Sequence, residues 1–327
     1  MEVLEAFLEA FTSAAVEGQG QNAPNAPQNG PSGSRRNPQQ YRPPRPNRPV
    51  YDPVEAARIQ KLYRSNRRKA MNHLLKGKSP PCPLDESTII NHLGSSSSGP
   101  PITDGSALIE QNPVDEECAE WLLRTVGPTE VSRRLLGMSN TAPGPDKVRY
   151  NDLKRIDPGC YTLSMLYTRC MRMRKVPKGW KESETILLHK GGPVGDISNW
   201  RPLAMGNCVA KLYAAVLADR ITVWAQREQQ LSPEQKGFLT DEGCLEENFL
   251  LQSAIDDCRR SNKQLCVSWL DLSNAFGSVP HRHIFNTVER MGLPTGVINI
   301  VKDLYDGAGT RARTKMASQI ESFSAPE

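Results

Sequence analysis

The chain has 327 residues, 38% of them hydrophobic, and a formal net charge of +5 at pH 7. No run approaches the roughly 18 apolar residues of a transmembrane helix, and the acidic start MEVLEAFLEA lacks the basic region of a signal peptide. The eight cysteines form no CxxC or CxxH pair, so we expect free thiols in a reducing compartment, without a zinc site or disulfide. We therefore expect an intracellular protein that is neither secreted nor bound to a membrane.

The positive charge is concentrated in one segment. Residues 35–78 contain 13 Lys or Arg against two acids, a net charge of +11, whereas residues 79–327 contain 28 basic and 30 acidic residues. Nucleic acid is a common partner for a basic block of this size. A solvated, disordered arm explains the same composition.

Residues 1–50 are expected to be a mostly disordered arm, because residues 18–50 hold eight prolines among Gly, Asn, Gln, Ser and Arg. Residues 51–93 are interpreted as a basic helical N-terminal extension, with Pro53 at the first helical position. Residues 94–112, beginning with GSSSSGPP, are expected to form a linker. The cations expected to lie mostly off the apolar stripe of the extension, and to be able to face phosphates, are Arg64, Arg67, Arg68 and Lys69.

Residues 113–327 have the texture of a folded domain with helices and strands. The segment 184–205 predicts a β-hairpin with a long tip. A strand is expected to end at Asp271. Helices are predicted at 112–136, 147–174, 206–228, 244–260, 280–291 and 294–306.

The stretch LCVSWLDLSNAFGSVPH raises the question of why an apolar run is stopped by Asp271. One explanation is capping, because Asp and Ser side chains accept backbone N–H bonds where strands end and helices begin. The other is a metal site, because a carboxylate on a rigid strand end is a suitable oxygen ligand for Mg²⁺.

Several blocks, taken in order, carry a resemblance to a known family. They are TAPGPDKVRYNDLK, TILLHKGG, SNWRPLAMGNCVAKLYAAVLADRI, QKGF, NFLLQSAID and WLDLSNAFGSVPH. In this order the chain resembles a reverse transcriptase of the non-LTR (LINE-like) retrotransposon type, in the site-specific clade that often inserts into ribosomal RNA genes. The resemblance covers roughly residues 51–315. It implies an α+β fold, part of a right-hand polymerase with fingers and a truncated palm.

The resemblance also implies an RNA-directed DNA polymerase that acts on an RNA template, a DNA primer and dNTPs, with Mg²⁺ as cofactor. Asp271 matches the carboxylate that binds two Mg²⁺ ions, and Phe276 matches the aromatic that excludes a 2′-hydroxyl. The alternative for Phe276 is a core side chain. The backbone of Asn274 and Ala275 would face the triphosphate.

Two further positions are implied by the resemblance. Lys190 and Arg201 match basic residues of the fingers hairpin that contact the triphosphate; two exposed hairpin charges without a role are the alternative. The second is a segment that in the family lies near the template strand; it corresponds here to Gln235, Lys236 and Gly237.

The sequence departs from the family at two points. Gly277 stands where most reverse transcriptases have a second acid. No paired-Asp hairpin follows the strand of Asp271, and the pair Asp256–Asp257 is expected on a solvated helical face. One carboxylate does not build a two-metal site, so we expect this chain alone to be inactive. The alternatives are a non-catalytic RNA-binding fragment and a non-functional relic. A nuclear or cytoplasmic location is expected from the family's nuclear target.

Overall fold

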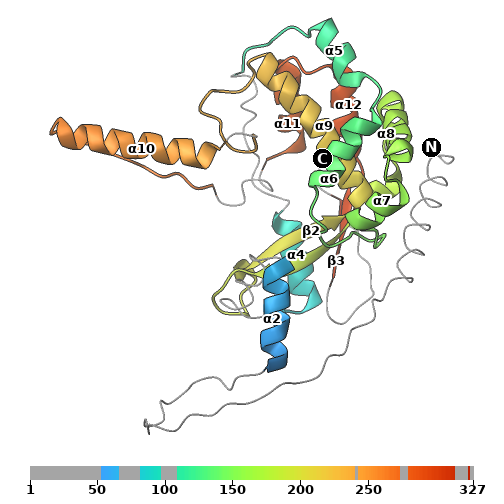
Figure 1. Cartoon of the computed structure of the whole chain (residues 1–327), viewed down its shortest axis with the longest axis horizontal. Coiled ribbons are helices and arrows are strands. Elements are labelled where there is room, and N and C mark those ends of the chain that lie inside the picture. Colours follow the sequence, from blue (N-terminus) through green and yellow to red (C-terminus); the bar gives the residue numbers. More distant parts are fainter. Residues whose placement is uncertain are drawn as a thin grey trace, which may run out of the picture. The chain divides into compact units, whose positions relative to one another are not determined.

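The computed structural model describes residues 53–65, 82–96, 109–239, 242–272, 279–313 and 323–324, and the helices and strands are labelled in Figure 1. These residues divide into two compact units. Unit 1 holds those within Leu84–Leu187 and Pro202–Glu327, and unit 2 those within Gly20–Pro83 and Leu188–Arg201. The predicted arm at 1–50 lies outside the described residues. No helix in the described part of the chain is long and apolar enough to cross a membrane.

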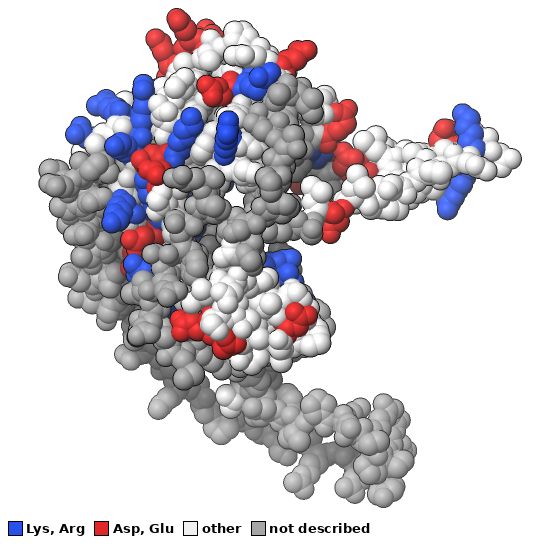
Figure 2. Space-filling model, turned by 180° about the vertical axis from the view of Figure 1, so that it is seen from behind, with Lys and Arg blue, Asp and Glu red and all other residues white. Residues whose placement is uncertain are grey.

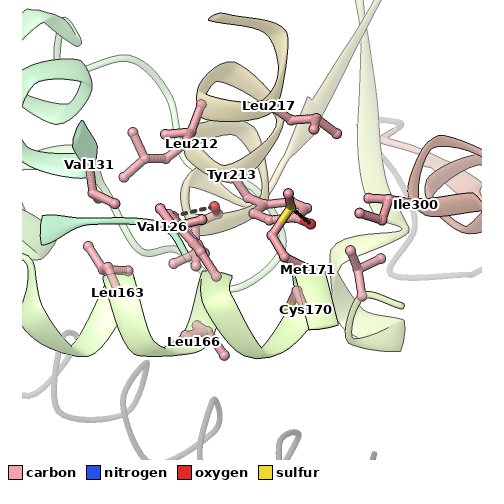
Figure 3. Close-up of a cluster of buried hydrophobic side chains, with 14 of the residues drawn as sticks. Val126, Val131, Leu163, Leu166, Cys170, Met171, Leu212, Tyr213, Leu217 and Ile300 are labelled. Carbon is pink, nitrogen blue, oxygen red and sulfur yellow. Dashed lines mark hydrogen bonds between the residues drawn. The ribbon is translucent and has the colours of Figure 1, made fainter. Parts of the chain in front are cut away.

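The core of unit 1 is built around α9 (Cys208–Arg227), which contacts α5, α6 and α7. The surrounding helices are α5 (Glu116–Leu123), α6 (Pro128–Gly137), α7 (Tyr150–Ile156), α8 (Tyr161–Met173) and α12 (Thr295–Tyr305). Figure 3 shows side chains of α8 and α9 meeting in this core, where the Tyr213 hydroxyl donates to the Met171 sulfur at 3.3 Å. Tyr167 and Trp180 pack edge to face, with ring centroids 5.9 Å apart. The helices are therefore held together by one continuous apolar core.

The long helices predicted at the C-terminal side are confirmed. The segments 206–228 and 294–306 form α9 and α12, while 244–260 forms α10 (Gly243–Arg260) and 280–291 forms α11 (His281–Arg290). Gly292 ends α11 with a φ of +84°, a conformation that favours glycine.

Two helices predicted as continuous are each split in two, so those predictions were wrong. The segment 112–136 is interrupted at 124–127: α5 ends at Leu123, and Pro128, which disfavours helical backbone at Gly127, begins a new helix. The segment 147–174 breaks at Asp157, because Pro158 cannot continue the helix. The Asp157 carboxylate accepts hydrogen bonds from the N–H groups of Tyr161 and Leu163, at 3.0 and 2.9 Å, and so begins α8.

The sheet has the strand order β2-β1-β3-β4. Its strands are β1 (Glu182–His189), β2 (Trp200–Gly206), β3 (Gly309–Ala312) and β4 (Phe323–Ser324). β1 and β2 form the predicted hairpin. β3 runs parallel to β1, and β4 runs antiparallel to β3. The mixture of helices with this sheet agrees with the α+β class.

The strand predicted to end at Asp271 is absent from the structure. Residues 263–272 have no regular secondary structure and are exposed. A strand is stable only when neighbouring strands accept its backbone hydrogen bonds, and no described strand pairs with this segment. The apolar run therefore has the composition of a strand without the partners of one.

The N-terminal part of the described chain contains two short helices. α2 (Pro53–Ser65) begins at the proline predicted for its first position and belongs to unit 2. α4 (Glu86–Ser96) belongs to unit 1, and the Asp85 carboxylate accepts the N–H of Thr88 at 3.0 Å. The boundaries proposed at 50, 93 and 112 remain predictions.

Candidate nucleotide-binding hairpin and its surroundings

The tip of the β1–β2 hairpin is fixed by one aromatic pair. The rings of His189 and Trp200 lie 4.8 Å apart, and Trp200 is 1% exposed. The Trp200 indole N–H donates to the Val194 carbonyl at 3.0 Å, which ties the loop back to the strand. At the base of the loop, the Lys190 N–H donates to the Asn199 carbonyl at 2.8 Å. These contacts define which face of the hairpin each neighbouring residue occupies.

Alternation along the strands assigns Arg201 of β2 and Lys190, the residue just after β1, to the same face of the hairpin. Side chains alternate along a strand, and His189 and Trp200 share one face, so their neighbours Lys190 and Arg201 project from the opposite face. Both side chains are exposed. The Lys190 ammonium donates to the Ser198 carbonyl at 3.4 Å, a long contact that leaves its other donors available. Strand alternation thus assigns to one face the two cations that lie on either side of the hairpin loop in the sequence.

Asp271 lies in the irregular segment 263–272 of unit 1 and is exposed. Asn274, Ala275 and Phe276 lie outside the described residues. Within the described ranges, no group of three or more potential metal ligands includes Asp271. One carboxylate does not fit two Mg²⁺ ions, because such a site needs several oxygen ligands to hold and orient both.

Gln235, Lys236 and Gly237 lie in the loop between α9 and α10. This loop and the end of α9 line a hollow of about 520 Å³ whose walls include the polar side chains of Gln226 and Gln229. The Lys236 ammonium pairs with Glu246 of α10 at 2.9 Å. A side chain at position 243 would lie 2.4 Å from the Lys236 Cβ, so glycine is needed there for the loop to approach the helix.

Arg64 is exposed in the last turn of α2, as expected for a phosphate-facing side chain. Arg67, Arg68 and Lys69 lie outside the described residues. Of the basic extension, 51–93, the structure therefore describes 53–65 and 82–93.

A partly buried carboxylate in the turn before α7 was not anticipated from the sequence. Asp146 lies in the TAPGPD turn, where burial raises its pKa to about 6 although its side chain accepts the Val148 N–H at 3.1 Å. In the same turn, a Cβ on Gly144 would lie 2.5 Å from the Asn207 side chain. The turn thus packs closely against the junction of β2 and α9. The Gly and Pro residues of TAPGPD were the sequence signal that could have indicated a closely packed turn here.

Three potential metal ligands also meet unexpectedly, at Asp115, Cys118 and Glu228, with their ligand atoms within 4.8 Å of one another. Asp115 caps α5 by accepting two backbone N–H bonds, and the Cys118 thiol donates to Glu228 at 3.2 Å. The hydrogen bond to Asp115, with burial and Glu228, raises the pKa of Cys118 to about 12. A helix cap at Asp115 and a protonated thiol at Cys118 therefore explain why these three side chains lie together, without a metal ion. All eight cysteines are free, four of them buried.

Comparison with known proteins accounts for the hairpin and for the residues after it. Residues 188–324 match the family model described as reverse transcriptase (RNA-dependent DNA polymerase). Residues 188–324 form part of a reverse transcriptase domain. The match begins at the strand end that carries Lys190 and includes Asp271, so the family prediction made from the ordered motifs is confirmed.

Individual relatives agree with the predicted retrotransposon type. The chain is 27% identical over 197 residues to the Pol polyprotein of retrotransposable element R2 from Popillia japonica, covering 60% of this chain and 26% of that protein. It is 27% identical over 190 residues to the R2 polyprotein of Nasonia vitripennis, covering 58% of this chain and 18% of that protein. It is 22% identical over 171 residues to the R2DM polyprotein of Drosophila melanogaster, covering 52% of this chain and 16% of that protein. R2 elements are the site-specific clade predicted from the sequence.

These alignments cover about a quarter or less of each relative's own length. The match to a reverse transcriptase domain is therefore established for residues 188–324. The activity of the whole polyproteins, their substrates and their partners are not carried over by the match.

Proposed function

We propose that this chain takes part in RNA-directed DNA polymerisation and that the β1–β2 hairpin holds the incoming nucleotide. The observation that supports this most directly is the common face of Lys190 and Arg201. Two cations on one rigid hairpin match the charge of a triphosphate, since Arg can bind two phosphate oxygens and Lys acts as a point charge. The His189–Trp200 pair keeps both side chains on that face before the nucleotide arrives.

In the proposed reaction, the 3′-hydroxyl of a DNA primer attacks the α-phosphorus of a dNTP paired to an RNA template. A new P–O bond forms to the primer while the bond to pyrophosphate breaks. Lys190 and Arg201 hold the triphosphate and offset the charge that develops on the leaving pyrophosphate. Phe276 excludes a 2′-hydroxyl, the backbone at Asn274 and Ala275 faces the phosphates, and Gln235, Lys236 and Gly237 lie near the template.

A divalent cation belongs to this proposal as the cofactor. Mg²⁺ would supply charge neutralisation of the phosphates, and Asp271 would provide one carboxylate ligand. Within the described ranges, Asp271 belongs to no group of three or more potential metal ligands. We propose an intracellular location, nuclear or cytoplasmic, because template and primer are found there.

The test is primer extension on an RNA template. The transcript is first sequenced through the codon for Glu327, and the protein that it encodes is used in the assay. Lys190→Gln and Arg201→Gln should each raise the KM for dNTP about 10- to 100-fold, the worth of a charged hydrogen bond. Asp271→Asn should abolish extension. Arg259→Gln, an exposed cation on α10, is the matched control and should leave KM unchanged. Equal KM values for the hairpin variants and the control would contradict the proposal.

A second candidate function is RNA binding without chemistry. It rests on the net charge of +11 in residues 35–78, which would bind phosphates without regard to sequence and more weakly at higher salt. A salt-dependent shift of RNA by a protein that does not extend a primer would favour this candidate.

A further inference from the structure

The outward face of α8 carries exposed side chains of two kinds. Residues 158–181 include six Lys or Arg and no acid. Side chains separated by three or four positions share one side of a helix, and at this spacing an aromatic and a thioether are followed by cations. Figure 2 shows several Lys and Arg side chains at the upper left of the view, and others elsewhere on the described surface. The set, called the α8 stripe, consists of Tyr161, Met165, Arg169, Arg172 and, just beyond the helix, Lys175.

The orientation of the α8 stripe is fixed by the opposite side of the helix. Leu163, Tyr167 and Cys170 on that side are fully buried in the core of unit 1. Tyr161 and Met165, by contrast, are 69% and 71% exposed. The stripe therefore cannot turn inward without dismantling the core, and its apolar members remain in water.

Two acids that lie next to the α8 segment, one in the sequence and one in the structure, are engaged elsewhere. Asp157 is 6% exposed, and its carboxylate caps α8 by accepting hydrogen bonds from the N–H groups of Tyr161 and Leu163. Asp303 accepts the N–H of Val176 at 2.8 Å and pairs with Lys181 at 3.3 Å. Within the described ranges, no ion pair is formed by Arg169, Arg172 or Lys175. Among the residues that the structure describes, no ion pair therefore compensates the positive charge of the stripe.

A solvated helical face explains only part of this arrangement. Arg172 in the last turn stabilises the helix dipole. The dipole does not account for Arg169 in the helix body, for Lys175 beyond it, or for an exposed tyrosine and methionine on the same side. An exposed aromatic next to a row of cations suits single-stranded nucleic acid, where bases stack on rings and phosphates contact the charges.

We propose that the α8 stripe binds single-stranded RNA. Arg169, Arg172 and Lys175 contact phosphates, and Tyr161 stacks on an unpaired base. The eleven steps along the helix from Tyr161 to Arg172 span about 16 Å at 1.5 Å per residue, enough for several nucleotides. A single strand is favoured over a duplex because the faces of paired bases are not available for stacking. This binding does not depend on polymerisation, so it can fail or succeed separately from the proposed function.

The charged part of the stripe is tested by salt dependence. Binding of the full chain to a 20-nucleotide (CA)₁₀ RNA is measured across a series of salt concentrations. The triple variant Arg169→Gln, Arg172→Gln, Lys175→Gln should reduce the slope of log K against log salt by about 2, since each phosphate contact with a single strand contributes about 0.7. The control triple variant removes three exposed cations elsewhere, Arg259→Gln, Arg260→Gln and Arg282→Gln, and should change the slope by less than about 0.5.

Both triple variants keep the basic segment 35–78, so its contribution cancels in the comparison. Equal loss of slope in the two would show that only net charge matters and would overturn the proposal. An equally tight complex with a 20-base-pair RNA duplex would overturn the assignment to a single strand.

The aromatic part of the stripe has its own test. Tyr161→Leu should weaken binding about 5- to 150-fold with an unchanged salt slope, whereas Tyr161→Phe should bind as the parent does, because stacking needs only the ring. With 4-thiouridine in the RNA, the cross-linked peptide should contain Tyr161. Unchanged affinity of Tyr161→Leu together with cross-links that avoid residues 158–175 would refute the proposal. Because Tyr161 is exposed, its substitution should not unfold the protein, and weaker RNA binding would not be due to loss of folding. Thermal melting of each variant checks this.

Discussion

Arg220 is the cation on which the core of unit 1 depends, and its removal tests the packing argument directly. Its side chain is 2% exposed and donates five hydrogen bonds. Two go to the Glu130 carboxylate, at 2.7 and 2.8 Å. The others go to the carbonyls of Leu122, Arg124 and Thr125, at 2.9, 2.8 and 3.1 Å. One guanidinium thus joins α9 to the end of α5 and the start of α6.

The substitution Arg220→Met keeps most of the length of the side chain and removes every donor. Breaking a buried ion pair from one side costs about 3–5 kcal/mol, and each carbonyl left without a donor would add to this. Because Glu130 keeps some contact with solvent, we expect the free energy of unfolding to fall by about 4 kcal/mol. That is a large share of the roughly 5–15 kcal/mol that stabilises a typical domain.

The assay is urea unfolding followed by tryptophan fluorescence, since Trp224 lies one turn from Arg220 on α9. Arg134→Met is the matched control. It makes the same chemical change in an exposed pair with Asp219 and should cost about 1 kcal/mol or less. Adding Glu130→Gln to Arg220→Met should recover part of the loss, because the stranded carboxylate becomes neutral. Equal losses for Arg220→Met and Arg134→Met would refute the view that burial gives this pair its weight.

Two further predictions concern the turn and a helix end. Burial raises the pKa of Asp146 to about 6, so its stabilising contribution is complete below about pH 4 and is lost as the pH rises through 6. Asp146→Asn should therefore stabilise the protein at pH 7.5 by about 2–3 kcal/mol and by much less at pH 4.5; a gap independent of pH in urea unfolding would contradict this. Gly292→Ala places a Cβ 2.8 Å from the Pro113 carbonyl at a φ of +84° and should cost about 1–3 kcal/mol. Gly137→Ala, with open space around it, should cost nothing measurable by thermal melting.

The elements that the sequence predicted correctly are those whose signal is local and repeated. α9 shows apolar residues at helical spacing over its 20 residues, and no tertiary contact is needed to recognise it. The splits at Gly127 and Asp157 depend on single residues before proline, and an apolar pattern that continues in phase across them conceals the break. The role of Arg220 was not predictable, because its partner Glu130 is 90 positions away and its other partners are backbone carbonyls.

The hairpin and the α8 stripe show how the same kind of charge information can be found or missed. Lys190 and Arg201 were selected through the family resemblance, and their common face is set by the His189–Trp200 pair, which alternation along the strands could have suggested. The α8 stripe lies in an acid-free run of 24 residues. It was hidden when charge was counted over residues 79–327, where acids on other elements cancel it. Counting charge along one predicted helix face would have revealed it.

The segment that ends at Asp271 shows what an apolar pattern does and does not determine. Trp269 and Leu270 are 79% and 92% exposed, and Phe249 of α10 is 72% exposed. Burial of these apolar side chains would be favourable, by roughly 25 cal/mol for each Å² of apolar surface removed from water. Which partner provides that burial is a property of the tertiary structure, and the pattern is identical whether a strand is paired or not. A carboxylate at the end of such a run is held rigidly only when the strand is paired. The role proposed for Asp271 in catalysis therefore depends on residues that would hydrogen-bond to 265–271, and formation of that pairing is the structural condition for the activity.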